Sequence, residues 1–243
     1  MSRFHPNIVV SDVFGSAGDV TAHHRDGKTY LRKRSRPVHP MSEAQAAHLE
    51  VHRRALAAWR DVPDEVKERW NEFAREVEPH RPPFDHSSWI SGQNLFVSAY
   101  HGFFTLGDEH VPEAQRFVSF PPFAVSVVEA AEAGGDLVVR VETAGLSYVE
   151  ASRYWLYGKV QLMPAGSGIG NAAWKSVLAA GACSSSPVEL ILKDWRNVWP
   201  DVDVEASALQ MHGKFVLLDA ETGYRSQRRR LSCGLRITKR EVL

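Results

Sequence analysis

The hydrophobic pattern changes its period once along the chain, and this change limits the folds open to it. Between residues 42 and about 104, apolar side chains recur every three or four residues, which is typical of amphipathic helices. From about Val118 onward, short segments alternate between apolar and polar residues, which is typical of strands with one buried face. We therefore predict an α+β protein, in which a small helical bundle is followed by an antiparallel, immunoglobulin-like β-sandwich.

Residues 1–40 are predicted to form a β-hairpin and a basic arm. The segments NIVVSDVF and KTYLRKR flank Asp26-Gly27, a strong signal for a hairpin turn. An isolated hairpin is only marginally stable in water, so we expect this one to rest on its own chain or on a neighbouring subunit. Its candidate contact residues are Tyr30, Arg32, Lys33, Arg34 and Arg36.

Residues 41–110 are predicted to hold an αα-hairpin and a third helix. Ser42 and Gln45 fit a capping box that starts the first helix. Pro63 suits the first position of the second helix, where its missing N–H has no cost. The apolar stripes expected to face the core are Leu49, His52, Leu56 and Trp59 in the first helix, and Val66, Trp70, Phe73 and Val77 in the second. The third helix is predicted over SGQNLFVSAYHGFF.

The stretch WRDVPDEVKERWNEFA resembles one part of a DNA-bending HMG box. In that fold, however, the helix similar to SGQNLFVSAY precedes this stretch, whereas here it follows it. The strongly basic last helix of the box is replaced by a segment that contains Glu72, Glu76 and Glu78. We therefore interpret the two tryptophans as the corner of a packed bundle, with contact to DNA as the alternative.

Residues 118–243 are predicted to hold six or seven short strands. FAVSVVEA and DLVVRVE flank Gly134-Gly135 as a hairpin. The strands RYWLYGKVQLM, AAWKSVLAA and PVELILKD follow, and a hairpin with a Thr-Gly turn ends the sequence. Turn signals between the strands are typical of a sandwich.

The charges exclude a strong global field but leave both ends of the sequence basic. The chain has 29 basic and 29 acidic residues, with a local excess of basic residues in 19–40 and 221–243. Such clusters contact phosphates or acidic surfaces, although a solvated face is the more frequent explanation. The second cluster adds the candidate contact residues Arg228, Arg229 and Arg230.

No motif in the sequence predicts catalysis, a cofactor or a metal site. His48 and His52 have a spacing that suits zinc, but the segment HLEVH lacks the glutamate position of a metalloprotease helix. The GSGIG segment at 166–170 lacks the Lys-Ser/Thr of a phosphate-binding loop. Cys183 has no nearby histidine, and Cys183 and Cys233 are expected to be free thiols, with a disulfide as the alternative.

The sequence predicts a soluble protein made in the cytoplasm, without a membrane partner. Its first residues lack the apolar stretch of a signal peptide. No run approaches the roughly 18–20 apolar residues of a membrane span.

The order of several segments resembles a loosely defined group of uncharacterised proteins from Bacteroidetes genomes and phages. The matching pieces are FGSAGDV, DGKTYLRKR, MSEAQ, AWRDVPDEVKERW, SGQNLFVSAY and GYRSQRRRLSCG. The resemblance implies a virion component that assembles through contacts between copies. Our leading hypothesis is therefore a non-enzymatic structural protein whose partners are further copies or other virion proteins. The alternative is a nucleic-acid-binding protein that uses its basic ends and the helical hairpin.

Overall fold

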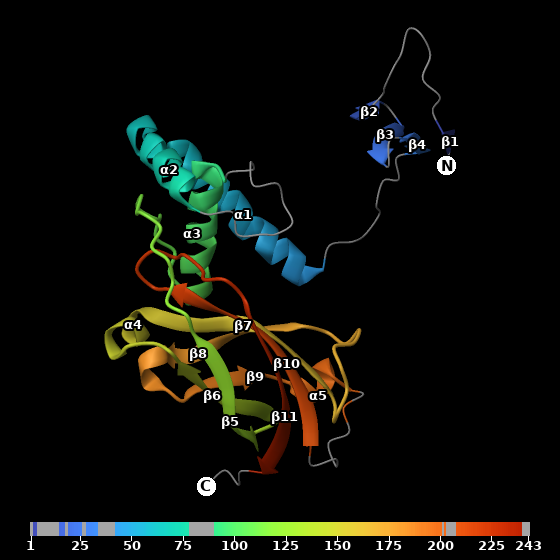
Figure 1. The fold of residues 1–243 in the computed structure, drawn as a ribbon, viewed down its shortest axis with the longest axis vertical. Helices are drawn as coiled ribbons and strands as arrows, with labels where there is room; N and C mark the ends of the chain where they lie inside the picture. Colours follow the sequence, from blue (N-terminus) through green and yellow to red (C-terminus); the bar gives the residue numbers. More distant parts are fainter. Residues whose placement is uncertain are drawn as a thin grey trace. The chain divides into compact units, whose positions relative to one another are not determined.

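The computed structural model describes residues 2–3, 15–17, 19–25, 28–33, 42–77, 90–200, 202 and 208–239. The chain divides into two compact units, residues 1–47 and residues 48–243. The second unit contains most of the helical segment together with the large sheet. Helices and strands mix in the way that the α+β class requires, so the predicted class is confirmed (Figure 1).

The first unit contains a four-stranded antiparallel sheet in the order β1-β4-β3-β2. Its strands are β1 (Ser2–Arg3), β2 (Gly15–Ala17), β3 (Val20–Arg25) and β4 (Lys28–Lys33). Arg25 pairs with Lys28, so Asp26 and Gly27 are the two residues between the strands, as the turn signal predicts. The first predicted strand, NIVVSDVF, lies outside the described residues, and the strand that pairs with β4 at this turn is β3.

Helix α1 (Glu43–Asp61) starts with the predicted capping box. The Ser42 N–H donates to Gln45 Oε1 at 3.0 Å, and the Gln45 N–H donates to Ser42 Oγ at 3.3 Å. The buried residues of this helix are Val51 and Ala55. The four predicted stripe residues are half-buried, so the most buried line of the helix lies beside the predicted stripe.

Helices α2 (Asp64–Glu76) and α3 (Gly92–Leu106) pack against each other. Trp70 of α2 is fully buried and meets the Phe96 ring of α3 edge-on at 5.5 Å between centroids. Trp59, near the end of α1, lies 5.2 Å from the same ring. Both tryptophans therefore pack on the same ring of α3, although the predicted helical bundle as a whole is not confirmed.

Seven strands form one continuous sheet in the order β8-β7-β10-β11-β5-β6-β9 (Figure 1). Their bounds are β5 (Ala124–Ala133), β6 (Asp136–Ala144), β7 (Tyr154–Pro164), β8 (Lys175–Ala182), β9 (Val188–Leu192), β10 (Ala208–Asp219) and β11 (Arg229–Lys239). The short helices α4 (Tyr148–Arg153), η1 (Cys183–Ser185) and α5 (Trp195–Val198) lie in the connections.

Strand β11 joins the two halves of this sheet, so two separate sandwich sheets are not confirmed. Its first part pairs with β10, while Ile237–Lys239 pair with Ala130–Glu132 of β5. This second pairing is parallel, so the expectation of a wholly antiparallel arrangement is wrong at this place. The edge strands β8 and β9 contact each other, and one apolar core is shared by both halves. The sheet therefore curls around its own core.

The turn between β10 and β11 packs directly on α3. The Tyr224 side chain belongs to the same core cluster as Trp70 and Phe96, and its hydroxyl donates to the Gln115 carbonyl at 2.7 Å. The turn is held from the other side by a bidentate ion pair between Arg153 and the nearly buried Asp219. These contacts fix the helical pair to the sheet.

Candidate interaction surfaces

The N-terminal candidate residues that the structure describes lie on β4. Tyr30 is half-buried, while Arg32 and Lys33 are exposed. Since side chains alternate along a strand, Tyr30 and Arg32 share one face and Lys33 lies on the other. Arg34 and Arg36 lie outside the described residues.

The second basic cluster, Arg228 to Arg230, does not lie on a single face of the sheet. Arg228, Arg229 and Arg230 are all exposed, and β11 begins at Arg229. The Arg229 guanidinium lies 6.0 Å from the centre of the Phe123 ring, whereas Arg230 belongs to the opposite face of the strand. The three arginines, predicted as one contact cluster, are therefore separated by the sheet.

Strand register brings together three cations that the sequence analysis missed as a group. Lys214 of β10 lies directly opposite Lys159 of β7 on one side and Arg230 of β11 on the other. Directly paired residues project to the same face of a sheet, here the face opposite the core residues Val160 and Phe215. We call Lys159, Lys214 and Arg230 the cation row.

A loop between β7 and β8 lies against this face. The Gln161 amide donates to the carbonyls of Gly170 and Ala172 at 3.0 and 2.5 Å. His212 Nε2 lies 3.0 Å from the Ser167 carbonyl, so two buried side chains hold the loop. The GSGIG segment is thus a connecting loop, as expected, but a tethered one.

The tethered loop places Trp174 beside the cation row. The Lys214 ammonium lies 3.7 Å from the centre of the Trp174 indole ring, a cation–π contact. Beside the row, His212 Nδ1 and Ser232 Oγ lie 3.0 Å apart, and the Gln210 amide donates to the same oxygen at 3.2 Å. The face therefore combines positive charge, an aromatic ring and polar groups.

Three histidines gather where α1 meets α3. The rings of His48 and His52 stack on the ring of His101, with centroid distances of 4.8 and 5.7 Å. The described residues include no group of three or more His, Cys, Asp or Glu side chains arranged to hold a metal ion. Behind His101, Arg225 donates to the His101 carbonyl and to Thr105 Oγ1, both at 3.0 Å. The stacking makes this a packing contact between helices.

The environment of His101 lowers its pKa from the ordinary 6.5 to about 4. Burial is the largest cause, followed by His48, Arg225 and His52, each of which disfavours a second positive charge. Between pH 4 and pH 6.5, His101 is therefore mostly neutral in the folded chain and mostly protonated in the unfolded chain.

Acid should weaken the fold through this histidine. The free energy of unfolding should be highest above pH 6.5 and decline towards pH 4, by about 1–2 kcal/mol for His101 after allowance for its partial exposure. Urea unfolding at pH 7 and pH 4.5 measures the decline. His101→Gln should reduce it, because an amide does not titrate in this range, and an equal decline in both proteins would contradict the assignment.

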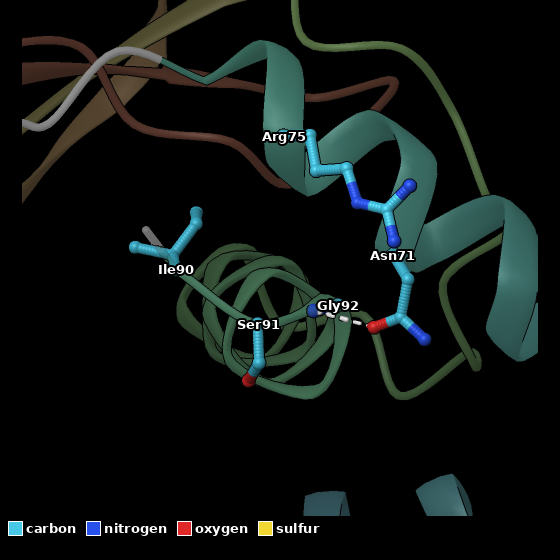
Figure 2. A pocket seen from close by; sticks show the side chains of 5 residues that line it. All are labelled: Asn71, Arg75, Ile90, Ser91 and Gly92. Carbon is cyan, nitrogen blue, oxygen red and sulfur yellow. Dashed lines mark hydrogen bonds between the residues drawn. The ribbon is translucent and has the colours of Figure 1, made fainter. Parts of the chain in front are cut away.

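One surface cavity of about 440 Å³ lies where α2 meets the start of α3. Figure 2 shows Asn71 and Arg75 on α2 beside Ile90, Ser91 and Gly92, with the Gly92 N–H donating to Asn71 Oδ1 at 3.1 Å. The Ser91 hydroxyl accepts from the Asn94 N–H and caps α3. Asn71 and Ser91 thus already serve the helix junction, which leaves Arg75 as the remaining charged group of the cavity.

The two cysteines are free thiols. Cys183 is buried and Cys233 is half-buried, and burial raises the pKa of both thiols above the ordinary value. A high pKa keeps the reactive thiolate scarce. These residues therefore make poor nucleophiles.

A scan against protein-family models and a search of curated proteins found no match for this chain. None of the described helices is long and apolar enough to cross a membrane.

Proposed function

We propose that the chain is a non-enzymatic assembly subunit of the phage-virion type, which docks on a neighbouring subunit through its N-terminal sheet. The observation that carries this proposal is that the four short strands of the first unit leave apolar side chains uncovered. Val20 is 43% exposed, and Tyr30 and Leu31 are only half-buried, while Ala22 and Thr29 are the buried side chains described in this sheet. A sheet with so little buried surface gains stability from a partner.

Strand pairing gives the partner a place to bind. Among the described residues, strands β1 and β2 form the two edges of the sheet, and they are two and three residues long. Edge strands present unpaired backbone N–H and C=O groups, which a strand from another subunit can satisfy. Arg32 is exposed on one face of β4 and Lys33 on the other, so both faces of the sheet favour acidic groups on a partner.

The test is the association state of the full chain, measured by size-exclusion chromatography with light scattering over a range of concentrations. We expect association that weakens at least tenfold in Val20→Glu, because a charge replaces apolar contact area. Val111→Glu is the matched control, since Val111 is 51% exposed but belongs to the second unit. A monomer at every concentration, with no partner recovered from the native source, would overturn the proposal.

The geometry of the helical hairpin does not support the alternative that it binds the minor groove of DNA. An apolar wedge for the minor groove must be exposed, whereas Trp70 is fully buried and Trp59 packs on Phe96. The assembly proposal therefore takes precedence over this form of nucleic-acid binding.

A further inference from the structure

Charged residues that pair across neighbouring strands are arranged differently in the two halves of the large sheet. In the half built from β5, β6 and β9, Arg140 lies between Glu129 and Glu189 on neighbouring strands. Its guanidinium reaches these carboxylates at 3.5 and 3.0 Å, so acid, base and acid alternate. This ladder is internally neutralised, as expected of charges that serve the fold.

The corresponding row in the other half contains only cations. Lys159, Lys214 and Arg230 lie directly opposite one another on three neighbouring strands, about 4.8 Å apart from strand to strand. Within the part of the chain that the structure describes, no carboxylate forms an ion pair with any of the three. Like charges directly opposite each other destabilise a sheet. Because these three cations lack neutralising carboxylates, the row does not stabilise the fold as the Arg140 ladder does.

The groups around the row add an aromatic component. The Trp174 indole lies against Lys214, and Tyr157 is on the same face, one alternation from Lys159 along β7. Both rings are partly exposed. The loop that carries Trp174 is anchored by Gln161, so the ring is held in place before any ligand arrives.

We propose that the outer face of β7, β10 and β11 binds single-stranded nucleic acid, with the cation row contacting phosphates and Trp174 stacking on a base. Positive charge that follows the backbone, together with aromatic rings that stack on bases, is the combination that single strands require. Beside the tethered loop, Lys159 and Arg230 are exposed and Lys214 is half-buried, so an unpaired strand can lie along the row. This site uses no residue of the N-terminal sheet or of the helical hairpin, and it adds a ligand to the assembly role.

The test is fluorescence anisotropy of a labelled oligo-dT 20-mer titrated with the full chain at several salt concentrations. Release of counterions from three phosphates predicts a slope of about −2 for log K against log salt, at about −0.7 per phosphate. The double variant Lys214→Gln/Arg230→Gln should weaken binding at 50 mM salt at least tenfold and bring the slope to about −0.7. Lys193→Gln should leave both values unchanged, because Lys193 is exposed after β9 in the other half of the sheet.

Two further measurements identify the ligand. Trp174→Leu should weaken binding about fivefold or more without changing the salt slope, since stacking involves no counterion. Binding to a duplex of the same length should be weaker than binding to the single strand, because paired bases are not free to stack.

Three results would overturn the proposal. The first is an absence of oligo-dT binding by the wild-type chain at 50 mM salt. The second is a double variant that binds as the wild type and Lys193→Gln do. The third is a row-dependent affinity for vesicles with 20% phosphatidylserine that exceeds the affinity for oligo-dT, which would assign the face to a lipid surface. A single variant, Lys159→Gln, repeats the test at an exposed position where misfolding is not expected.

Discussion

Trp70→Ala should cost about 3–5 kcal/mol of the free energy of unfolding, the loss typical of a deleted core tryptophan. Trp70 is fully buried and touches the rings of Phe96 and Tyr224 edge-on, at 5.5 and 6.5 Å between centroids. Its removal leaves a cavity at the point where α2, α3 and the turn after β10 meet. Thermal and urea unfolding of the full chain measure the loss.

Two companion variants separate packing from other causes. Trp59→Ala should cost clearly less, because Trp59 is partly exposed and packs on Phe96 from one side. Trp70→Phe should also cost less than the alanine variant, since it keeps an aromatic ring and removes a buried indole N–H that has no hydrogen-bond partner among the described residues. If Trp70→Ala and Trp59→Ala are equally stable, Trp70 is not the centre of the helical core.

Gly102→Ala should destabilise the chain by about 3 kcal/mol, although alanine normally favours a helix over glycine. A Cβ atom at Gly102 would lie 1.8 Å from the Gly223 carbonyl oxygen, so the turn after β10 would have to move away from α3. Gly223 has a φ of +71°, and a Cβ there would meet the Ala99 carbonyl at 2.3 Å, so the approach is tight from both sides. The melting temperature should fall by about 6–12 °C.

The matched control for this prediction is Ser98→Ala, at an exposed position of the same helix. It should change stability by no more than about 0.5 kcal/mol. A Gly102→Ala variant as stable as Ser98→Ala would contradict the close contact between α3 and the turn. The same contact predicts that Gly223→Ala also lowers the free energy of unfolding. An alanine there would both press on the Ala99 carbonyl and be strained by the positive φ.

Local signals in the sequence were sufficient for the elements that depend on near neighbours. Asp26-Gly27 predicted the hairpin of β3 and β4, and Ser42 with Gln45 predicted the start of α1, because a turn and a cap are decided within a few residues. The apolar stripe around Trp70 predicted the packed face of α2 for the same reason. The stripe of α1 was displaced, since the neighbours that choose its buried side are distant in sequence.

The arrangement of the strands depended on partners that are far apart in the sequence. Alternation located β5, β6 and β7 but could not show that β11 would pair with β10 and, in parallel, with β5. The single curled sheet in place of a sandwich follows from that choice. The local residue pattern of β11 does not indicate with which strands it pairs.

The sequence by itself determined the α+β class, the starts of α1 and α3 and the basic character of both ends, because propensity, period and charge are local properties. The tertiary structure alone decided which charges meet. Lys159, Lys214 and Arg230 are 55 and 16 residues apart in order, and only the register of three strands makes them one row. A shift of one residue would turn a strand's charges to the other face, so the candidate surface exists only in the folded sheet.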